Sequence, residues 1–136
     1  MHHRFFVIPS QGCYVLRYSG HVSVADVMSL CLQVWADPKF EDDFDAIIDF
    51  RHAKIMKSFG DMPSLVNFFR SRKPATGRAA VIVEDKRLIE LIAVFRASAQ
   101  HLFSYEIVPS WEHACNVLGK SIKDGSSAPL SLDRVI

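Results

Sequence analysis

The sequence predicts an α/β domain with a mixed, mostly parallel sheet of four or five strands, flanked by four helices. Its 136 residues suit one domain with a single core. Apolar residues make up 49% of the chain and charged residues 23%, which is the composition of a folded globular protein. After an opening pair of strands, short apolar runs alternate with longer segments of helical periodicity, which predicts the order ββαβαβαβα.

The opening strands come from two apolar runs, residues 4–8 and 13–18, which are separated by Pro-Ser-Gln-Gly. Two such runs around a short turn are typical of a hairpin. We expect Gly20 to end the second strand. Since the later strands are each followed by a helix, this hairpin is what makes the predicted sheet mixed.

The first helix is predicted from its cap and its periodicity. Ser23 and Asp26 stand at the spacing of a capping box, in which the two side chains each accept a hydrogen bond from a backbone N–H group of the other residue. Apolar residues then recur at helical spacing from Val24 to Trp35, and Pro38 lies just beyond them. The pattern predicts an amphipathic helix over residues 24–35.

Two further apolar runs predict buried parallel strands. The run at residues 45–50 carries a carboxylate at each margin, and the next run spans residues 78–84. Between them we expect a polar, basic loop from Arg51 to Asp61. Pro63 then opens a helix with a broad apolar face.

The last elements follow the same alternation. Asp85 is expected to cap a long helix over residues 86–101, residues 105–108 form the last strand, and Ser110 caps the final helix. The stretch Lys-Asp-Gly-Ser-Ser-Ala-Pro at residues 123–129 has the composition of a linker. We therefore expect one domain over residues 1–121 and a flexible tail over residues 122–136.

Charge and run length exclude several classes of partner. Sixteen basic and fifteen acidic side chains leave a net charge of +1, so no basic field gathers nucleic acid. No run approaches the roughly 20 apolar residues of a membrane span. The absence of a secretory pattern and the three widely spaced cysteines favour a cytoplasmic protein. Ile89 and Val94 lie outside the main apolar stripe of their helix, which favours a homodimer.

Motifs of cofactor, metal and catalytic chemistry are not found. Gly60 and Gly77 stand alone rather than in a phosphate-binding loop, and the six histidines are scattered without metal-ligand spacing. The sequence also has no Gly-x-Ser-x-Gly elbow and no recognisable acid–base pair. We therefore expect no cofactor, no metal and no catalytic residues, that is, a protein that is not an enzyme.

The candidate site is the loop after the third strand. Ligands of open α/β sheets collect at the carboxyl ends of parallel strands, where the N–H groups of helix N-termini point. Of the three loops expected at that edge, which follow the strands at residues 45–50, 78–84 and 105–108, this one is the longest and chemically the most mixed. The candidates for binding a partner or an anion are Asp49, Arg51, His52, Lys57, Gly60 and Asp61, with Phe68 on the next helix.

Ser58 in this loop has two interpretations. It caps the following helix, or it accepts a phosphate, which would face the positive end of the helix and pair with Lys57 or Arg51. As a nucleophile it has only His52 nearby as a base, six residues away.

The element order and three segments resemble a known fold. The segments are Tyr-Ser-Gly-His-Val-Ser-Val-Ala-Asp at residues 18–26, Ala-Ile-Ile-Asp-Phe-Arg at residues 46–51 and Ser-Trp-Glu-His-Ala at residues 110–114. Over about residues 5–119 the chain resembles a STAS-type domain of the SpoIIAA-like group, the fold of bacterial anti-sigma-factor antagonists. A more distant likeness is to the related CRAL-TRIO lipid-binding type.

The resemblance implies a phosphorylated serine in the same loop. In the antagonists, an Asp-Ser-Ser-Gly signature follows a strand ending in Asp, and a partner kinase phosphorylates its first serine. Counted from Asp49, the signature falls on Lys57, Ser58, Phe59 and Gly60, so the first serine and the glycine agree and the other two residues differ.

Two functions of different classes follow. The first is a non-enzymatic regulatory module of STAS type, which binds a protein partner, a regulator or a kinase, through the loop and the adjacent helix, where Phe68 and Phe69 stand side by side. The alternative is a carrier of a small apolar, lipid-like ligand of the CRAL-TRIO kind, in a pocket between the sheet and the helices, which the ten phenylalanines suggest.

Overall fold

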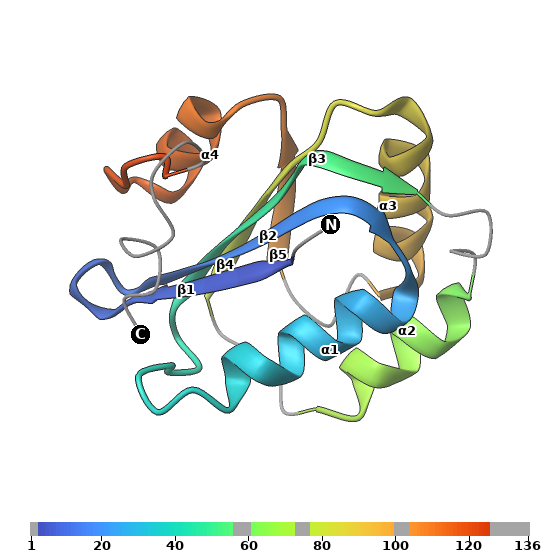
Figure 1. The fold of residues 1–136 in the computed structure, drawn as a ribbon, viewed down its shortest axis with the longest axis horizontal. Coiled ribbons are helices and arrows are strands. Elements are labelled where there is room, and N and C mark those ends of the chain that lie inside the picture. The colour runs from blue at the N-terminus through green and yellow to red at the C-terminus, as the bar shows by residue number, and fades with distance from the viewer. Residues whose placement is uncertain (1–2, 56–60, 73–76, 100–103, 126–136) are drawn as a thin grey trace.

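Five strands form a single mixed sheet in the computed structural model, which describes residues 3–55, 61–72, 77–99 and 104–125 (Figure 1). The strands lie side by side in chain order, the first pair antiparallel and all the others parallel. They are β1 (Arg4–Ile8), β2 (Cys13–Val22), β3 (Asp45–Ile55), β4 (Arg78–Ile82) and β5 (Ser104–Val108). The predicted α/β class with a mixed, mostly parallel sheet is confirmed.

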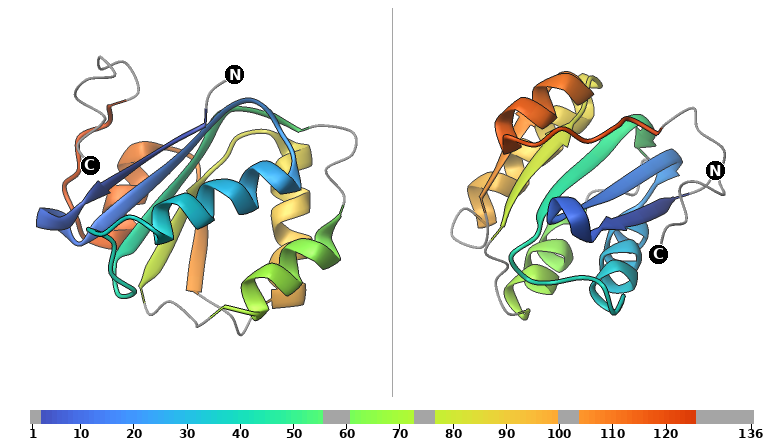
Figure 2. Two further views of the ribbon diagram at one scale, coloured as in Figure 1. Left: turned by 60° about the horizontal axis from the view of Figure 1, so that its bottom comes forward. Right: turned by 90° about the vertical axis from the view of Figure 1, so that its left-hand side faces the viewer.

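Four helices within the described residues flank this sheet. They are α1 (Val24–Trp35), α2 (Met62–Arg70), α3 (Lys86–Ala99) and α4 (Trp111–Leu118), and a short 3-10 turn, η1 (Pro9–Gln11), joins β1 to β2. The crossovers from β2 to β5 all step in one direction across the sheet, so right-handed connections place α1, α2 and α3 on the same face. α4 packs on the opposite face, against β4 and β5 (Figure 2).

The alternation of side chains along the strands divides the core in two. Leu16 and Tyr18 of β2 belong to the larger cluster beneath α1–α3, whereas their neighbour Val15 belongs to the smaller cluster beneath α4. On β3, Phe50 and Ile47 are divided in the same way. A fully buried parallel sheet needs apolar residues on both faces, which is why its strands appear as continuous apolar runs.

Two strands are longer than the sequence predicts. β2 continues through Gly20 to Val22, and β3 continues to Ile55, because the extensions pair with each other. Gly20 has a positive φ of 80°, a conformation that glycine adopts without strain, and a register shift lies just before it. The prediction that a loop begins at Arg51 is therefore wrong: Arg51 is a strand residue.

The predicted caps are confirmed for three helices. Ser23 and Asp26 form the capping box of α1. The Ser110 hydroxyl caps α4 by accepting from the backbone N–H of His113. The Asp85 carboxylate accepts from the backbone N–H of Leu88, at the start of α3.

The chain packs on beyond α4. Ile122 is buried against the α4 cluster, its carbonyl accepts from Trp111 Nε1 at 2.7 Å, and Asp124 bonds to arginines of the sheet. The ordered domain thus extends at least three residues past the expected boundary at residue 121. In the right-hand view of Figure 2, this segment crosses from α4 over the strands.

Ile89 and Val94, which suggested a second apolar face on α3, differ in how exposed their side chains are. Ile89 packs against the main core, so its place outside the stripe does not make it exposed. Val94 is 52% exposed. Only Val94 therefore stays available, among these two, for contact with another molecule.

Candidate functional site

The residues predicted for the site are scattered in the structure. Lys57, Ser58 and Gly60 lie outside the described residues. Asp61 caps α2 by accepting from the backbone N–H of Ser64 at 3.3 Å, so the capping role considered for Ser58 is taken by Asp61.

His52 and Phe68 also lie apart from one another. His52 is exposed on β3, beside Ser19 of β2. Phe68 is half-buried on α2 and stacks on Trp35 of α1, with 5.5 Å between ring centroids. Phe68 therefore joins two helices and is less exposed than a docking residue was expected to be.

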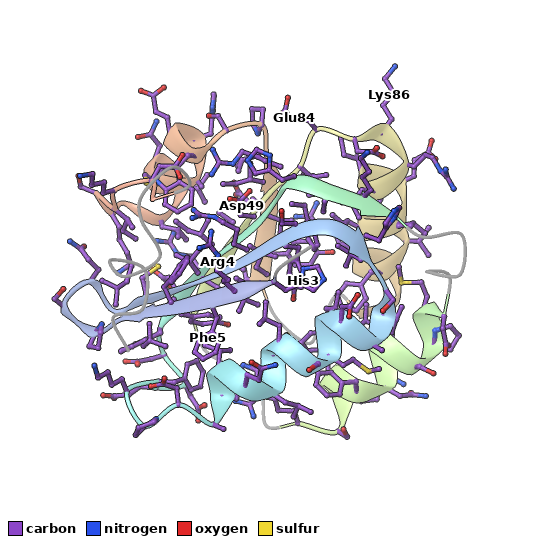
Figure 3. The ribbon with its side chains drawn as sticks, viewed as in Figure 1. His3, Arg4, Phe5, Asp49, Glu84 and Lys86 are labelled. Atoms are coloured by element: carbon purple, nitrogen blue, oxygen red, sulfur yellow. The ribbon has the colours of Figure 1, made fainter. Side chains whose placement is uncertain are left out.

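Asp49 and Arg51 are brought together, in a cluster that sequence reasoning did not foresee. Arg17 Nε donates to Asp49 Oδ2 at 2.9 Å, and Arg51 donates to both oxygens of Asp49, from Nε at 3.0 Å and Nη2 at 2.8 Å. Asp124 binds both arginines from the far end of the chain. We call these four residues the Arg–Asp cluster; Figure 3 shows Asp49 on β3, on the side of the sheet toward α4.

The electrostatics of the cluster hold its charges in place. Burial raises the pKa of Asp49, but the hydrogen bonds from Arg51 and Arg17 outweigh it, so the pKa lies below its ordinary value. The carboxylates of Asp49 and Asp124 raise the pKa of Arg51. Asp49 and Arg51, predicted as partner- or anion-binding residues, lie on β3, where their side chains are bonded to each other.

An apolar cavity of about 90 Å³ lies on the other face, between the sheet and helices α1–α3. Few voids in a protein interior exceed the size of a water molecule, so this one is a distinctive feature of the core. It is lined by Leu16, Tyr18, Val27, Cys31, Ile48, Phe50, Met62, Leu65, Phe69, Val81, Leu88, Leu91, Ile92, Phe95 and Tyr105.

The cavity wall is uncharged. Tyr18 is 1% exposed, and its hydroxyl has no hydrogen-bond partner among the described residues. Burial raises the pKa of Tyr18 well above its ordinary value, and burial likewise raises the pKa of Cys31 to about 12. Both groups are therefore protonated at physiological pH, and the tyrosine hydroxyl is a hydrogen-bond donor with nothing to donate to.

Replacing Tyr18 by phenylalanine is expected to raise the free energy of unfolding by about 1 kcal/mol, because the buried hydroxyl no longer goes without a partner. Tyr105→Phe is the matched control. Its hydroxyl donates to the Ile92 carbonyl at 3.1 Å, so this variant should lose about 1 kcal/mol. Urea denaturation measures both, and a loss of stability in Tyr18→Phe would show that its hydroxyl has a partner.

Little of the Arg–Asp cluster and of the cavity could be predicted from the sequence. A charged residue within each of two apolar strands, Arg17 and Asp49, was a signal of a buried pair. The cavity has no such signal, because it is a volume that many well-separated side chains together leave unfilled.

Comparison with known proteins adds no assignment. No protein-family model matches the sequence, and no curated protein matches it. Among the described residues, no group of three or more His, Cys, Asp or Glu side chains is placed to hold a metal ion. Within those same segments, no helix has the length and apolar character needed to cross a membrane. Inference about function therefore depends on the cavity and on the Arg–Asp cluster.

Proposed function

We propose that this protein is a non-enzymatic binding domain that holds a small, neutral, largely apolar ligand between the sheet and helices α1–α3. The observation that carries the proposal is the cavity of about 90 Å³ with its apolar surface. A ligand that covers this surface removes it from water, which favours binding by roughly 25 cal/mol per Å² of apolar surface.

The dimensions of the cavity set the size of the ligand. A dry apolar cavity of about 150 Å³ binds benzene in another protein. The volume here is smaller, so it suits a compact molecule of a few carbon atoms, or the end of a longer apolar chain. It is too small for a whole lipid.

The wall chemistry sets the polarity of the ligand. Every lining side chain is apolar apart from the Cys31 thiol and two tyrosine hydroxyls, and Tyr105 donates its hydroxyl proton to Ile92. No polar atom of the lining is exposed to the cavity, so a polar group of a ligand would be buried there without a partner, and a charged group without a counter-ion. A small hydrocarbon fits these conditions best.

Methyl NMR with two ring compounds of equal size tests the proposal. Cyclopentanone and cyclopentane should both shift the methyl signals of Leu65, Val81 and Leu91 in the wild type. Cyclopentane should bind about tenfold more tightly, because the oxygen of cyclopentanone loses its water and gains no donor in the apolar cavity, and Tyr18→Phe should leave the difference unchanged. Absence of shifts at these three methyl groups, with either compound, would refute the proposal.

Filling the cavity with protein is expected to stabilise the fold and to remove the site. Val81→Leu adds one methylene to the cavity wall and should raise the free energy of unfolding by about 0.8 kcal/mol. Cyclopentane binding should weaken at least tenfold. Val34→Leu is the control, since Val34 is fully buried in the same cluster but does not line the cavity. Overpacking there should cost about 1–3 kcal/mol.

A second candidate is the STAS-type regulatory module, with Ser58 as phosphate acceptor and a protein partner. It is supported by the observed succession of one antiparallel strand pair and three β–α–β crossovers, which agrees with the element order of the resemblance. In the sequence Ser58 follows the end of β3, and ligands of open α/β sheets collect at the carboxyl ends of parallel strands.

Phosphopeptide mapping of the protein isolated from its own cells tests this second candidate. Phosphate on Ser58 is expected, together with a co-purifying protein that Ser58→Asp binds at least tenfold more weakly than the wild type. Ser29→Asp, an exposed serine on α1, is the control and should bind normally. Unmodified Ser58, with equal binding by all three proteins, would rule the module out.

The homodimer remains part of this second candidate. Val94 on α3 and Leu32 on α1, which is 56% exposed, are the large apolar side chains found exposed within the described residues. Sedimentation should show a dimer that Val94→Glu dissociates; a wild-type monomer at micromolar concentration would remove the proposal.

A further inference from the structure

The α4 face of the sheet holds a carboxylate in a geometry that a ligand could use. Arg51 binds Asp124 with two parallel bonds, Nη1 to Oδ2 at 2.9 Å and Nη2 to Oδ1 at 3.1 Å, and Arg17 Nη2 adds a third at 3.3 Å. Such a fork is the arrangement in which arginine recognises planar carboxylates in general. Asp124 therefore occupies a built carboxylate site.

The charge of the site calls for one negative group. Arg17 and Arg51 contribute two positive charges and Asp49 one negative charge, so the three sheet residues together keep one positive charge that Asp124 neutralises. Arg17 is 3% exposed, and its Nη1 is buried without a hydrogen-bond partner among the described residues. The site thus offers more donors than Asp124 uses.

A buried apolar cluster adjoins this carboxylate site. Ile122, two residues before Asp124, is 8% exposed and belongs to the cluster beneath α4. The Trp111 ring lies between the two halves: its Nε1 donates to the Ile122 carbonyl, and both guanidinium groups lie over the ring at 5.3 and 5.5 Å from its centroid. The combined site therefore fits an apolar body with one carboxylate.

The group that fills the site belongs to a segment that side-chain contacts, rather than a ladder of backbone bonds, hold to the domain. Residues 120–125 are neither helix nor strand, and they follow Gly119, which ends α4 with a positive φ of 65°. Besides Ile122 and Asp124, the bonds from this segment to the rest of the chain include one from Lys120 Nζ to the Gln11 carbonyl. A segment outside regular structure exchanges more easily than one held by a ladder of backbone bonds.

We propose that Arg17 and Arg51 form the binding site of an aliphatic monocarboxylate, and that the chain's own Ile122 and Asp124 occupy this site in its absence. The ligand carboxylate takes the place of the Asp124 side chain, and its hydrocarbon takes the place of Ile122. This site is separate from the apolar cavity, because it lies on the opposite face of the sheet and takes an anion.

The internal segment is a competitor of the ligand. A tethered group competes at an effective concentration of the order of millimolar. The wild type is therefore expected to bind a carboxylate weakly, and a chain that has lost the Ile122 and Asp124 side chains should bind it more tightly.

Calorimetry with the full-length double variant Ile122→Ala/Asp124→Ala tests the proposal, at constant ionic strength. Hexanoate should bind the double variant at least tenfold more tightly than the wild type, and acetate should bind it more weakly than hexanoate. Hexanol, which lacks the charge, should not bind at this face. Asp43→Ala, an exposed carboxylate removed elsewhere, should bind hexanoate as the wild type does.

Two further variants keep the test decisive. Adding Arg51→Met to the double variant should abolish hexanoate binding, and hexanoate binding that survives this change would overturn the proposal. If circular dichroism shows that the double variant is unfolded, Asp124→Ala alone is heated with and without acetate. Acetate should raise the Tm of Asp124→Ala but not that of the wild type, and an equal effect on both proteins would also overturn the proposal.

Discussion

Asp49→Ala is expected to lower the free energy of unfolding by about 3–5 kcal/mol, a large fraction of the stability of a domain this size. Asp49 is 1% exposed and accepts hydrogen bonds from both Arg17 and Arg51. Its removal leaves the buried guanidinium group of Arg17 and the half-buried one of Arg51 with Asp124 as their remaining carboxylate in the cluster. Urea denaturation at neutral pH measures the loss.

Asp43→Ala is the control for Asp49→Ala, because it removes an exposed carboxylate from a loop and should change stability by less than about 0.5 kcal/mol. A cost below about 1 kcal/mol for Asp49→Ala would contradict the account. It would mean that water reaches the Arg–Asp cluster and solvates the two arginines.

The same carboxylate predicts an acid-sensitive fold. The pKa of Asp49 in the folded protein lies below the unfolded value of about 3.9, so its ionised form stabilises the fold at any pH above that value. This contribution is lost as the pH falls through the lower, folded pKa. The stability of the wild type should therefore fall below about pH 4 more steeply than that of Asp49→Asn.

Gly77→Ala should lower the free energy of unfolding by at least about 3 kcal/mol, because a Cβ atom at residue 77 would overlap the backbone of Phe44, just before β3. An ideally placed Cβ lies 2.1 Å from the Phe44 carbonyl oxygen and 2.6 Å from its carbon. Backbone atoms cannot rotate away as the end of a side chain can. The entry into β4, where the Arg78 N–H donates to Asp45, would have to move.

Gly119→Ala separates this overlap from ordinary glycine effects. Gly119 has a positive φ of 65°, but no atom lies within 4 Å of the position that a Cβ would take at this residue. It should cost only the strain of a left-handed residue, about 1–2 kcal/mol. Thermal denaturation of both variants provides the comparison, and equal losses would contradict the overlap at Gly77.

The element types were predictable because they depend on local patterns. The periodicity of α1 and its capping residues Ser23 and Asp26 lie within a dozen residues of each other, and the structure reproduces them. The length of β3 was not predictable in this way. Most residues of β3 after Phe50 are polar and would suit a loop, but their backbone groups pair with the extended end of β2.

The sites were less predictable because they join distant parts of the chain. Arg17 and Asp124 are 107 residues apart, and no local pattern relates them. Their pairing follows from the topology, in which β2 and β3 are neighbours and the segment after α4 crosses them. Glu84, which follows β4, and Lys86, the first residue of α3, by contrast point outward, as exposed polar residues do (Figure 3).

Native mass spectrometry of the protein isolated from its own cells tests the central claim most directly, namely that the cavity walled by Tyr18 and Val81 holds a small neutral molecule. The wild type should carry an added mass that collisional activation removes as a neutral species, and Val81→Leu should carry much less of it. Equal added mass on both proteins, or none on either, would contradict the claim.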